Sequence, residues 1–424
     1  MYIMAMGKYS LKPFKYIFGM NSVYLGNNYL WTSFESLFLP YEIELFLPQG
    51  LQTIYLGMIA FSGIMIGITF NFLSGTFSDR LNSKLGRRRP LIMIGSIIVV
   101  ISLIAFIFIR NGVLVIFLIY ILIEIGSNIA YGSYQPLIRD VIPSSQRGTS
   151  SGIGGFFTLV GSAFGFGLSG LLIGSGRIEL AVILILITVA VGASVTVLTI
   201  KKDDYISNSE IISRRILRII KSAARSEKFR WMAIANFFIT VGSSGLVFFE
   251  YYYFEYSLDL KNAAIYVAIA GVTILLISAV STVGIGVLAD KVNKDLLLLI
   301  FPLLSGFSIL FISFIHAFYM FLILGAIIGI AYGNYFTITN SYMSFIVPHG
   351  SAGKYLSIFL VSTEVGAAFS PLIYGIILFI FKSSGSLAYS RLFELSALLY
   401  FVGFILILLK VVDKKSLIVH HRTA

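Results

Sequence analysis

Three glutamates interrupt long apolar stretches of this sequence, and carboxyl groups in such places can carry a proton. They are Glu35, Glu124 and Glu364. Desolvation in a membrane interior favours the protonated form of a carboxyl, which lets it take up and release a proton near neutral pH. Glu124 is the first candidate, because it lies in the middle of its stretch and Asn128 follows one helical turn later. The alternative for each glutamate is a neutral hydrogen-bonded contact between helices.

A second group of residues combines amide and aromatic side chains. Amides bind hydroxyl groups, and the rings of Trp and Tyr stack on the apolar C–H faces of a sugar. Each residue alone is more often part of a core, but both halves of the chain contribute to the set. The candidate binding residues are Asn27, Asn28, Trp31, Asn128, Tyr131, Tyr134, Gln135, Tyr332, Asn334 and Asn340.

The elements that must position these residues are membrane-spanning helices. The 424-residue chain is 58% hydrophobic and 12% charged, with a mean hydropathy of +0.93. An apolar helix of about 20 residues crosses a bilayer. The sequence therefore predicts an all-α integral membrane protein. Its twelve expected helices are 14–39, 50–75, 90–109, 113–138, 149–174, 178–200, 231–256, 262–288, 295–315, 318–342, 353–381 and 387–410.

The basic residues are distributed unevenly over this topology. Of the 31 Lys and Arg residues, 26 fall on one side, and only Arg110, Arg177, Lys261, Lys382 and Arg391 fall on the other. Basic loops stay in the cytoplasm, so both termini are expected there, in a plasma-membrane protein. The net charge of +12 is then an orientation signal, and no nucleic-acid partner is expected.

The sequence offers little for metal or enzyme chemistry. It contains no cysteine, and its four histidines fall in predicted loops or in the C-terminal tail. No pair of nucleophile and base is recognisable. We therefore expect neither an enzyme nor a protein with a metal or a cofactor.

The two halves of the chain repeat each other. Gly286-Val-Leu-Ala-Asp290 echoes Gly75-x-x-x-Asp79, and Ala331-Tyr-Gly echoes Ala130-Tyr-Gly. A six-plus-six duplication is typical of transporters whose halves surround a central site. It predicts one six-helix bundle over 1–200 and another over 231–424 with a short cytoplasmic tail, joined by a Lys- and Arg-rich cytoplasmic linker over 201–230.

A charged motif between the second and third expected helices carries a family resemblance. It contains Gly75, Asp79 and Arg80, followed by Gly86-Arg87-Arg88-Arg89-Pro90. The motif resembles the loop signature of the major facilitator superfamily, and its full spelling resembles the branch of glycoside–pentoside–hexuronide:cation symporters and sucrose transporters. The spacing from Trp31 to Pro40 and from Glu124 to Asp140 resembles the same branch. The likeness covers residues 20–165 well, and the second half mainly through the repeat.

The resemblance implies two pseudo-symmetric bundles and alternating access. It implies symport of a sugar or glycoside, by a protein that usually acts as a monomer. Two features depart from the family. Gln135 stands where plant sucrose transporters have an Arg, and the second helix lacks the acidic pair that binds sodium in melibiose-type members. A proton is therefore the expected coupling ion rather than sodium. Proton-coupled export of amphipathic drugs or lipids, and a sensor that no longer transports, remain alternatives.

The charges at the helix ends are expected to act in gating and not in substrate binding. Helix-end carboxylates accept hydrogen bonds from neighbouring helices, and glycines allow close approach. We interpret these residues as latches of the inward-closed state. They are Gly75, Asp79, Arg80, Gly86, Arg87, Arg88, Asp140 with Arg147, Gly286 and Asp290.

Overall fold

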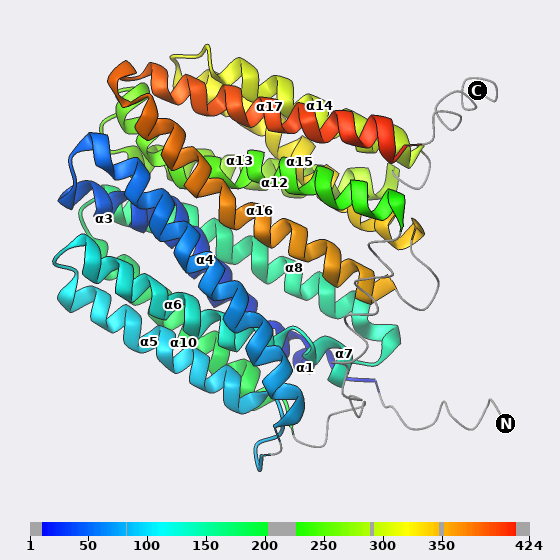
Figure 1. Ribbon diagram of the computed structural model, residues 1–424. Coiled ribbons are helices and arrows are strands. Elements are labelled where there is room, and N and C mark those ends of the chain that lie inside the picture. The colour runs from blue at the N-terminus through cyan, green and yellow to red at the C-terminus, as the bar shows by residue number, and fades with distance from the viewer. Residues whose placement is uncertain (1–10, 82, 202–225, 289–291, 347–351, 413–424) are drawn as a thin grey trace, which may run out of the picture. The chain divides into compact units, whose positions relative to one another are not determined.

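The computed structural model describes residues 11–81, 83–201, 226–288, 292–346 and 352–412, and their regular elements are helices (Figure 1). Eleven helices of this described part are long and apolar enough to cross a membrane. The first expected span makes the twelfth, because it is divided into shorter pieces. The expected all-α fold of twelve spans is thereby confirmed. Asp290 and residues 202–225 of the expected linker lie outside the described residues.

The first span differs from its prediction at the C-terminal end. It consists of α1 (Phe14–Asn21), α2 (Val23–Ser33), a π-helical segment (Phe34–Phe38) and α3 (Leu39–Phe46). The sequence predicts an end at residue 39, just before Pro40. The helix continues instead, because Pro40 lies in the first turn of a new segment, where a missing backbone N–H is tolerated. The π-helical segment immediately before it rearranges the backbone hydrogen bonds.

The other helices of the first half follow the prediction closely. The second, α4, runs five residues past its expected end at residue 75 and places the glycine and the acid of the charged motif inside the helix. The bounds are α4 (Gln49–Arg80), α5 (Arg89–Ile109), α6 (Val113–Tyr134), α7 (Leu137–Val141), α8 (Arg147–Phe164), a π-helical segment (Gly165–Ser169), α9 (Gly170–Gly174) and α10 (Ile178–Thr199).

The second half contains six spans with bounds close to those expected. They are α12 (Glu227–Tyr252) with a π-helical end (Tyr253–Ser257), α13 (Ala263–Leu288), α14 (Lys294–Ile312), α15 (Phe318–Ile346), α16 (Ala352–Ile380) and α17 (Leu387–Lys410).

The chain forms two compact units. One contains Met1–Glu42 and Ser62–Ile211, and the other contains Ile43–Phe61 and Ile212–Ala424. Helix packing repeats between them. In the first unit α2 packs on α8 and α10, and α5 packs on α6 and α10. In the second, α12 packs on α16 and α17, and α14 packs on α15 and α17. Each pair matches its counterpart in the duplication, so the repeat extends from sequence to packing.

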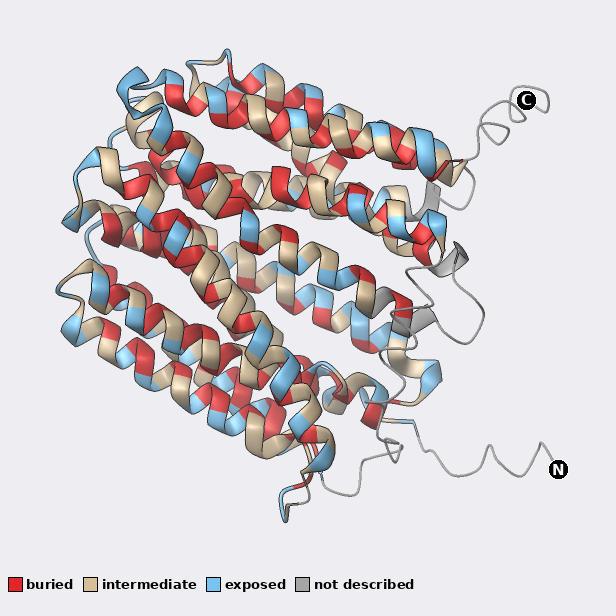
Figure 2. Cartoon of the chain, in the orientation of Figure 1, coloured by how far each residue is buried: buried red, intermediate tan, exposed pale blue. Residues whose placement is uncertain are grey.

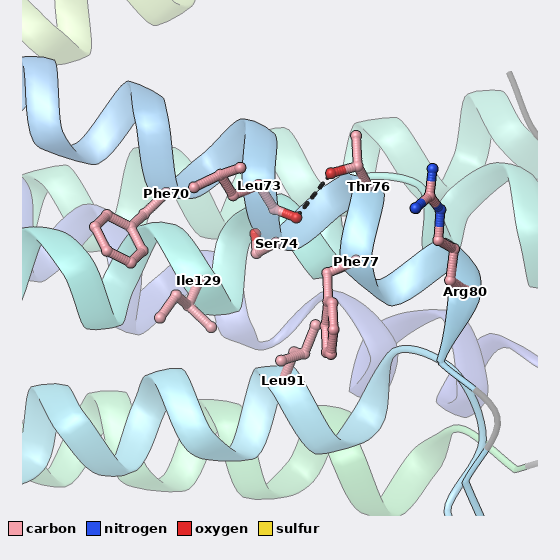
Figure 3. A pocket seen from close by; sticks show the side chains of 8 residues that line it. All are labelled: Phe70, Leu73, Ser74, Thr76, Phe77, Arg80, Leu91 and Ile129. Carbon is pink, nitrogen blue, oxygen red and sulfur yellow. Dashed lines mark hydrogen bonds between the residues drawn. The ribbon is translucent and has the colours of Figure 1, made fainter. Parts of the chain in front are cut away.

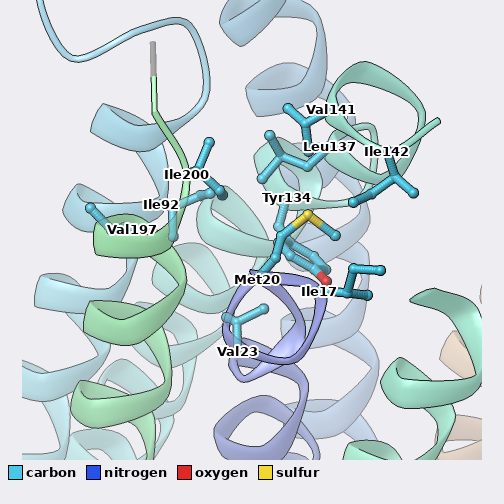
Figure 4. Packing of buried hydrophobic residues seen from close by; sticks show 10 residues of the cluster. All are labelled: Ile17, Met20, Val23, Ile92, Tyr134, Leu137, Val141, Ile142, Val197 and Ile200. Carbon is cyan, nitrogen blue, oxygen red and sulfur yellow. The ribbon is translucent and has the colours of Figure 1, made fainter. Parts of the chain in front are cut away.

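Aliphatic and aromatic side chains fill the interior of each unit, and apolar residues also cover the outside. Figure 2 shows buried faces where helices meet and exposed faces on the outer helices. Phe108 is 78% exposed, as expected for a side chain in contact with lipid tails. One buried cluster joins α1, α2, α5, α6, α7 and α10 (Figure 4). It consists of Ile17, Met20, Val23, Ile92, Tyr134, Leu137, Val141, Ile142, Val197 and Ile200.

Candidate functional site

Two matched rows of residues bring α4 and α6 together in the first unit. On α4, small and polar residues recur every four positions at Gly63, Gly67, Asn71 and Gly75. On α6, the same spacing gives Tyr120, Glu124, Asn128 and Gly132. Rows with this spacing form ridges that interlock when two helices cross, and glycine lets their backbones approach closely. The rows therefore place the predicted carboxyl against the backbone of a neighbouring helix.

The glycines of α4 leave the space that the side chain of Glu124 occupies. A methyl group on Gly67 would lie 2.4 Å from Glu124 Oε2 and 2.6 Å from Asn128 Nδ2. A methyl group on Gly63 would collide with the ring of Tyr120 and lie 3.1 Å from Glu124 Cγ. A larger residue at position 67 would displace the carboxyl, and one at position 63 would displace the ring of Tyr120. Sequence reasoning missed both glycines, although their spacing is a recognisable helix-packing signal.

Glu124 is 3% exposed and belongs to a hydrogen-bonded network. Asn128 donates from Nδ2 to Glu124 Oε2 at 2.9 Å and to the Glu124 carbonyl at 3.0 Å. Asn71 in turn donates from Nδ2 to Asn128 Oδ1 at 3.2 Å. The network stabilises a carboxyl in an apolar interior, because the amide of Asn128 donates a hydrogen bond to its charged form. The predicted pairing of Glu124 with Asn128 is present, and Asn71 is an addition.

The ring of Tyr120, one turn before Glu124 on α6, connects this site to the first span. The rings of Trp31 and Tyr120 meet edge to face, with centroids 6.3 Å apart. The phenol of Tyr120 lies within electrostatic range of both Glu124 and Glu35. Glu35 is partly exposed and lies in the π-helical segment of the first span. Such segments are frequent at functional sites. Three of the residues predicted from sequence, Trp31, Glu35 and Glu124, thus gather around one phenol.

The asparagines of α2 hold helices together. Asn27 Oδ1 accepts a hydrogen bond of 2.8 Å from Ser127 on α6, beside a cavity of about 20 Å³, which is room for one water molecule. Asn28 donates to the Tyr24 carbonyl and to Thr158 on α8. Both amides thus connect helices of the first unit.

Two predicted binding residues of α6 prove to have other surroundings. Tyr134 is fully buried in the cluster of Figure 4, and its hydroxyl donates to Asn21 Oδ1 at 2.8 Å. Tyr134 therefore packs between helices in this structure, and its role in binding stays a prediction. Gln135 is exposed and caps the end of α6. Tyr131 is partly exposed and packs edge to face with Tyr24, so it remains a candidate.

In the second unit, too, some of the predicted residues are exposed and another is buried. Tyr332 and Asn340 on α15 are partly exposed, and Glu364 on α16 is exposed. Asn334 is fully buried and donates to Ser281 on α13 at 3.2 Å. Asn334 therefore makes a contact between helices in this structure, and its role in binding stays a prediction.

The charged motif forms a buried cluster around Arg88. This guanidinium, 1% exposed, donates to Asp79 at 2.5 Å, to Asp140 at 3.0 and 3.1 Å, to Ser78 and to the Gly75 carbonyl. It thus ties the ends of α4 and α7 to the start of α5. Planar guanidinium groups suit such forked contacts.

The partners within the motif differ from those expected. Asp140 binds Arg88 and not Arg147, which donates to the carbonyls of Arg139 and Ile142. Arg80 is exposed. Gly86 has a φ of +94°, in a turn whose conformation favours glycine.

An open groove of about 390 Å³ lies beside this cluster (Figure 3). Its walls are mainly apolar, with the guanidinium of Arg80 at one end. None of the described residues predicted to bind a sugar belongs to this lining. The groove is lined by Phe70, Leu73, Ser74, Thr76, Phe77, Arg80, Leu91 and Ile129.

Comparison with known families covers nearly the whole chain. The model described as Major Facilitator Superfamily matches residues 16–284 and 267–422. This match confirms the resemblance drawn from the charged motif.

Similar curated proteins are sugar carriers by name. The chain is 28% identical over 162 residues to sucrose transport protein SUC4 of Arabidopsis thaliana, a match that covers 34% of this chain and 31% of that protein. It is 27% identical over 166 residues to the general alpha-glucoside permease of Schizosaccharomyces pombe, covering 36% and 29%. The matched part spans less than a third of the length of each of these relatives.

Solved structures with the same fold have lower identity. They include the POT family transporter PepTSo (TM-score 0.72, 13% identity, 93% of this chain and 96% of that chain). The D-xylose-proton symporter is a second (TM-score 0.68, 16% identity, 91% and 96%). At such identities the likeness shows the fold alone. The proteins matched here are transporters and permeases, not enzymes.

Proposed function

This chain belongs to the Major Facilitator Superfamily, and on that premise we propose that it is a secondary active transporter that couples a proton to a sugar or glycoside by alternating access. The observation that carries the proposal is the network around Glu124. A carboxyl in an apolar interior, stabilised in its charged form by an amide and without a cationic side chain on its own helix, suits reversible protonation.

The choice of a sugar as substrate is supported by two independent features. The named relatives carry sucrose and α-glucosides. Partly exposed residues of both units, Trp31, Tyr131, Tyr332 and Asn340, have the amide and aromatic chemistry that binds sugars. Export of amphipathic compounds and a sensor without transport are the outcomes that the test below separates.

We further propose the orientation and the setting. The excess of Lys and Arg on one side supports a plasma-membrane protein with both termini in the cytoplasm. The Arg88 cluster would then act as a cytoplasmic latch. We propose a proton rather than sodium as the coupling ion, no cofactor, and function as a monomer.

The test is uptake of radiolabelled sucrose and maltose into proteoliposomes with an alkaline interior. We expect the wild type to accumulate one of the sugars until a protonophore collapses the gradient. Glu124→Gln should equilibrate the sugar without accumulating it, since glutamine cannot carry the proton. Glu394→Gln is the matched control, because Glu394 lies in an exposed ion pair with Arg391 and should leave accumulation intact.

Each other outcome has a definite meaning. Accumulation by Glu124→Gln would overturn the role of Glu124 and direct attention to Glu364. Binding of sugar by the wild type without accumulation would indicate a sensor. If neither sugar moves or binds, the substrate class of the relatives does not apply, and export becomes the leading alternative.

A further inference from the structure

We propose that Asn71 on α4 is a positioning residue for the proton site: it fixes the side-chain amide of Asn128 so that the N–H group faces Glu124. The inference rests on the proposed role of Glu124 and deepens it. It assigns the protonation behaviour of this carboxyl to a residue on another helix that acts through the amide of Asn128.

The orientation of the Asn128 amide follows from one contact. A backbone carbonyl can only accept a hydrogen bond, and one end of the Asn128 amide lies 3.0 Å from the carbonyl oxygen of Glu124. That end must be the NH₂ group. The same NH₂ lies 2.9 Å from Glu124 Oε2, so Asn128 donates to the carboxyl group.

The other end of the same amide is held by α4. Asn128 Oδ1 accepts from Asn71 Nδ2 at 3.2 Å. The hydroxyl of Ser74 bridges the two helices nearby, with distances of 3.1 Å to the Asn71 carbonyl and 3.3 Å to the Asn128 carbonyl. Asn71 therefore gives the oxygen of Asn128 a donor and makes the opposite orientation of the amide unfavourable.

This orientation decides which form of Glu124 is favoured. An N–H donor stabilises the ionised carboxylate, whereas a carbonyl oxygen would stabilise the protonated acid. The other titratable groups facing the site are Tyr120 on the same helix and, beyond it, Glu35 on the first span. The charged residues of α4 are Asp79 and Arg80, about two turns past Asn71. Without Asn71, the oxygen of Asn128 loses its donor from α4, so the amide is held less firmly and its hydrogen bond to the carboxylate weakens, which favours the protonated form.

The test follows protonation of Glu124 directly and needs no substrate. The carbonyl stretch of a protonated carboxyl is titrated by infrared spectroscopy of the purified full-length protein in liposomes. The difference between the wild type and Glu124→Gln isolates the band of this residue. We expect Asn71→Leu to move its midpoint to higher pH by about half a unit or more. Asn71→Ala should give the same shift if the leucine variant does not fold.

Two controls make the result specific. Thr69→Val changes an exposed residue on the same helix and should leave the midpoint unchanged. In an Asn128→Leu background, Asn71→Leu should add no further shift, because the effect acts through that amide. An unchanged midpoint in the Asn71 variants, or an additive shift in the double variant, would overturn the inference.

The failure of this inference is distinguishable from failure of the proposed function. If the band titrates but ignores Asn71, Glu124 remains a proton site and only the positioning role is lost. If no band distinguishes the wild type from Glu124→Gln at any pH, Glu124 does not exchange a proton, and both proposals fail.

Discussion

The pair α4–α6 in the first unit and the pair α13–α15 in the second are counterparts in the duplication. Their glycine rows, however, lie on opposite members of the pair. In the first unit the glycines lie on α4 and receive side chains from α6. In the second they lie on α15, at Gly325, Gly329 and Gly333. There, added methyl groups would meet Ile274, Ser278 and Thr282 of α13.

The reversal holds at equivalent positions of the two helix pairs. The offset that relates Gly75 to Gly286 places Gly63 and Gly67 opposite Ile274 and Ser278. The offset between the two Ala-Tyr-Gly strings places Gly325 and Gly329 at the positions of Glu124 and Asn128. In each pair, larger side chains of one helix thus pack on the glycines of the other. The larger side chains lie on α6 in the first unit and on α13 in the second.

The difference teaches where ionisable chemistry can reside in a symmetric fold. Neither α13 nor α15 contains an Asp or Glu, and the side chains that fill the glycine row are aliphatic or hydroxylic. The first unit fills the equivalent space with a carboxyl and two amides. On the proposed function, we infer that of these two pairs only α4–α6 can carry a proton on an acidic side chain, and that α13–α15 serves packing.

The largest effect is expected from a substitution that disrupts the packing of α4 on α6. Gly67→Val would place side-chain atoms where Glu124 and Asn128 meet, since a methyl group there lies 2.4 Å from the carboxyl oxygen. We expect loss of gradient-driven accumulation and about 1–3 kcal/mol of lost stability from overpacking. Proteoliposome uptake and thermal unfolding in detergent measure the two effects. Normal accumulation by this variant would contradict the role of the glycine row.

The sequence predicted the main features of both pairs but not their contacts. Hydropathy and repeated strings predict spans, and an acid such as Glu124 in an apolar stretch is recognisable without a structure. The positions of Asn71 and Arg88 could not be deduced in the same way. An amide on a helix surface has no preferred partner until the crossing of two helices is known. Arg88 is one of three consecutive arginines, and only the fold decides which of them is buried.

The burial of Tyr134 and Asn334 escaped prediction for a related reason. Both residues have the chemistry of a binding site, and both lie on helices that also carry partly exposed candidates. Which face of such a helix turns inward depends on rotations of a few tens of degrees. In a chain whose helices are apolar on every side, no hydrophobic stripe reveals that rotation.

An intermediate effect is expected from the counterpart substitution in the second unit. Gly329→Val would meet the side chain of Ile274 at 2.8 Å and its carbonyl at 3.0 Å. The backbone cannot move as easily as a side chain, so stability should fall within the same range of about 1–3 kcal/mol. The ratio of accumulated to external sugar should stay that of the wild type. Loss of accumulation in folded Gly329→Val would show that coupling extends to the second pair.

The smallest expected effect compares the amides that bridge each pair. Asn334 donates to Ser281 Oγ at 3.2 Å and to the Ile330 carbonyl at 2.7 Å, but its Oδ1 has no hydrogen-bond partner among the described residues. Asn334→Leu removes these bonds together with a buried acceptor that is costly to leave unpaired. The two contributions oppose each other, so stability should change by no more than about 1 kcal/mol.

The infrared midpoint of Glu124 should not move in Asn334→Leu, in contrast to Asn71→Leu. A shift of similar size in both variants would mean that the carboxyl responds to general loosening of either unit. The amide on α4 would then have no specific role in orienting Asn128. If the midpoint shifts in Asn71→Leu and stays unchanged in Asn334→Leu, protonation of Glu124 is controlled within the α4–α6 pair. The comparison is specific because the two substitutions remove the same chemical group from equivalent helix pairs.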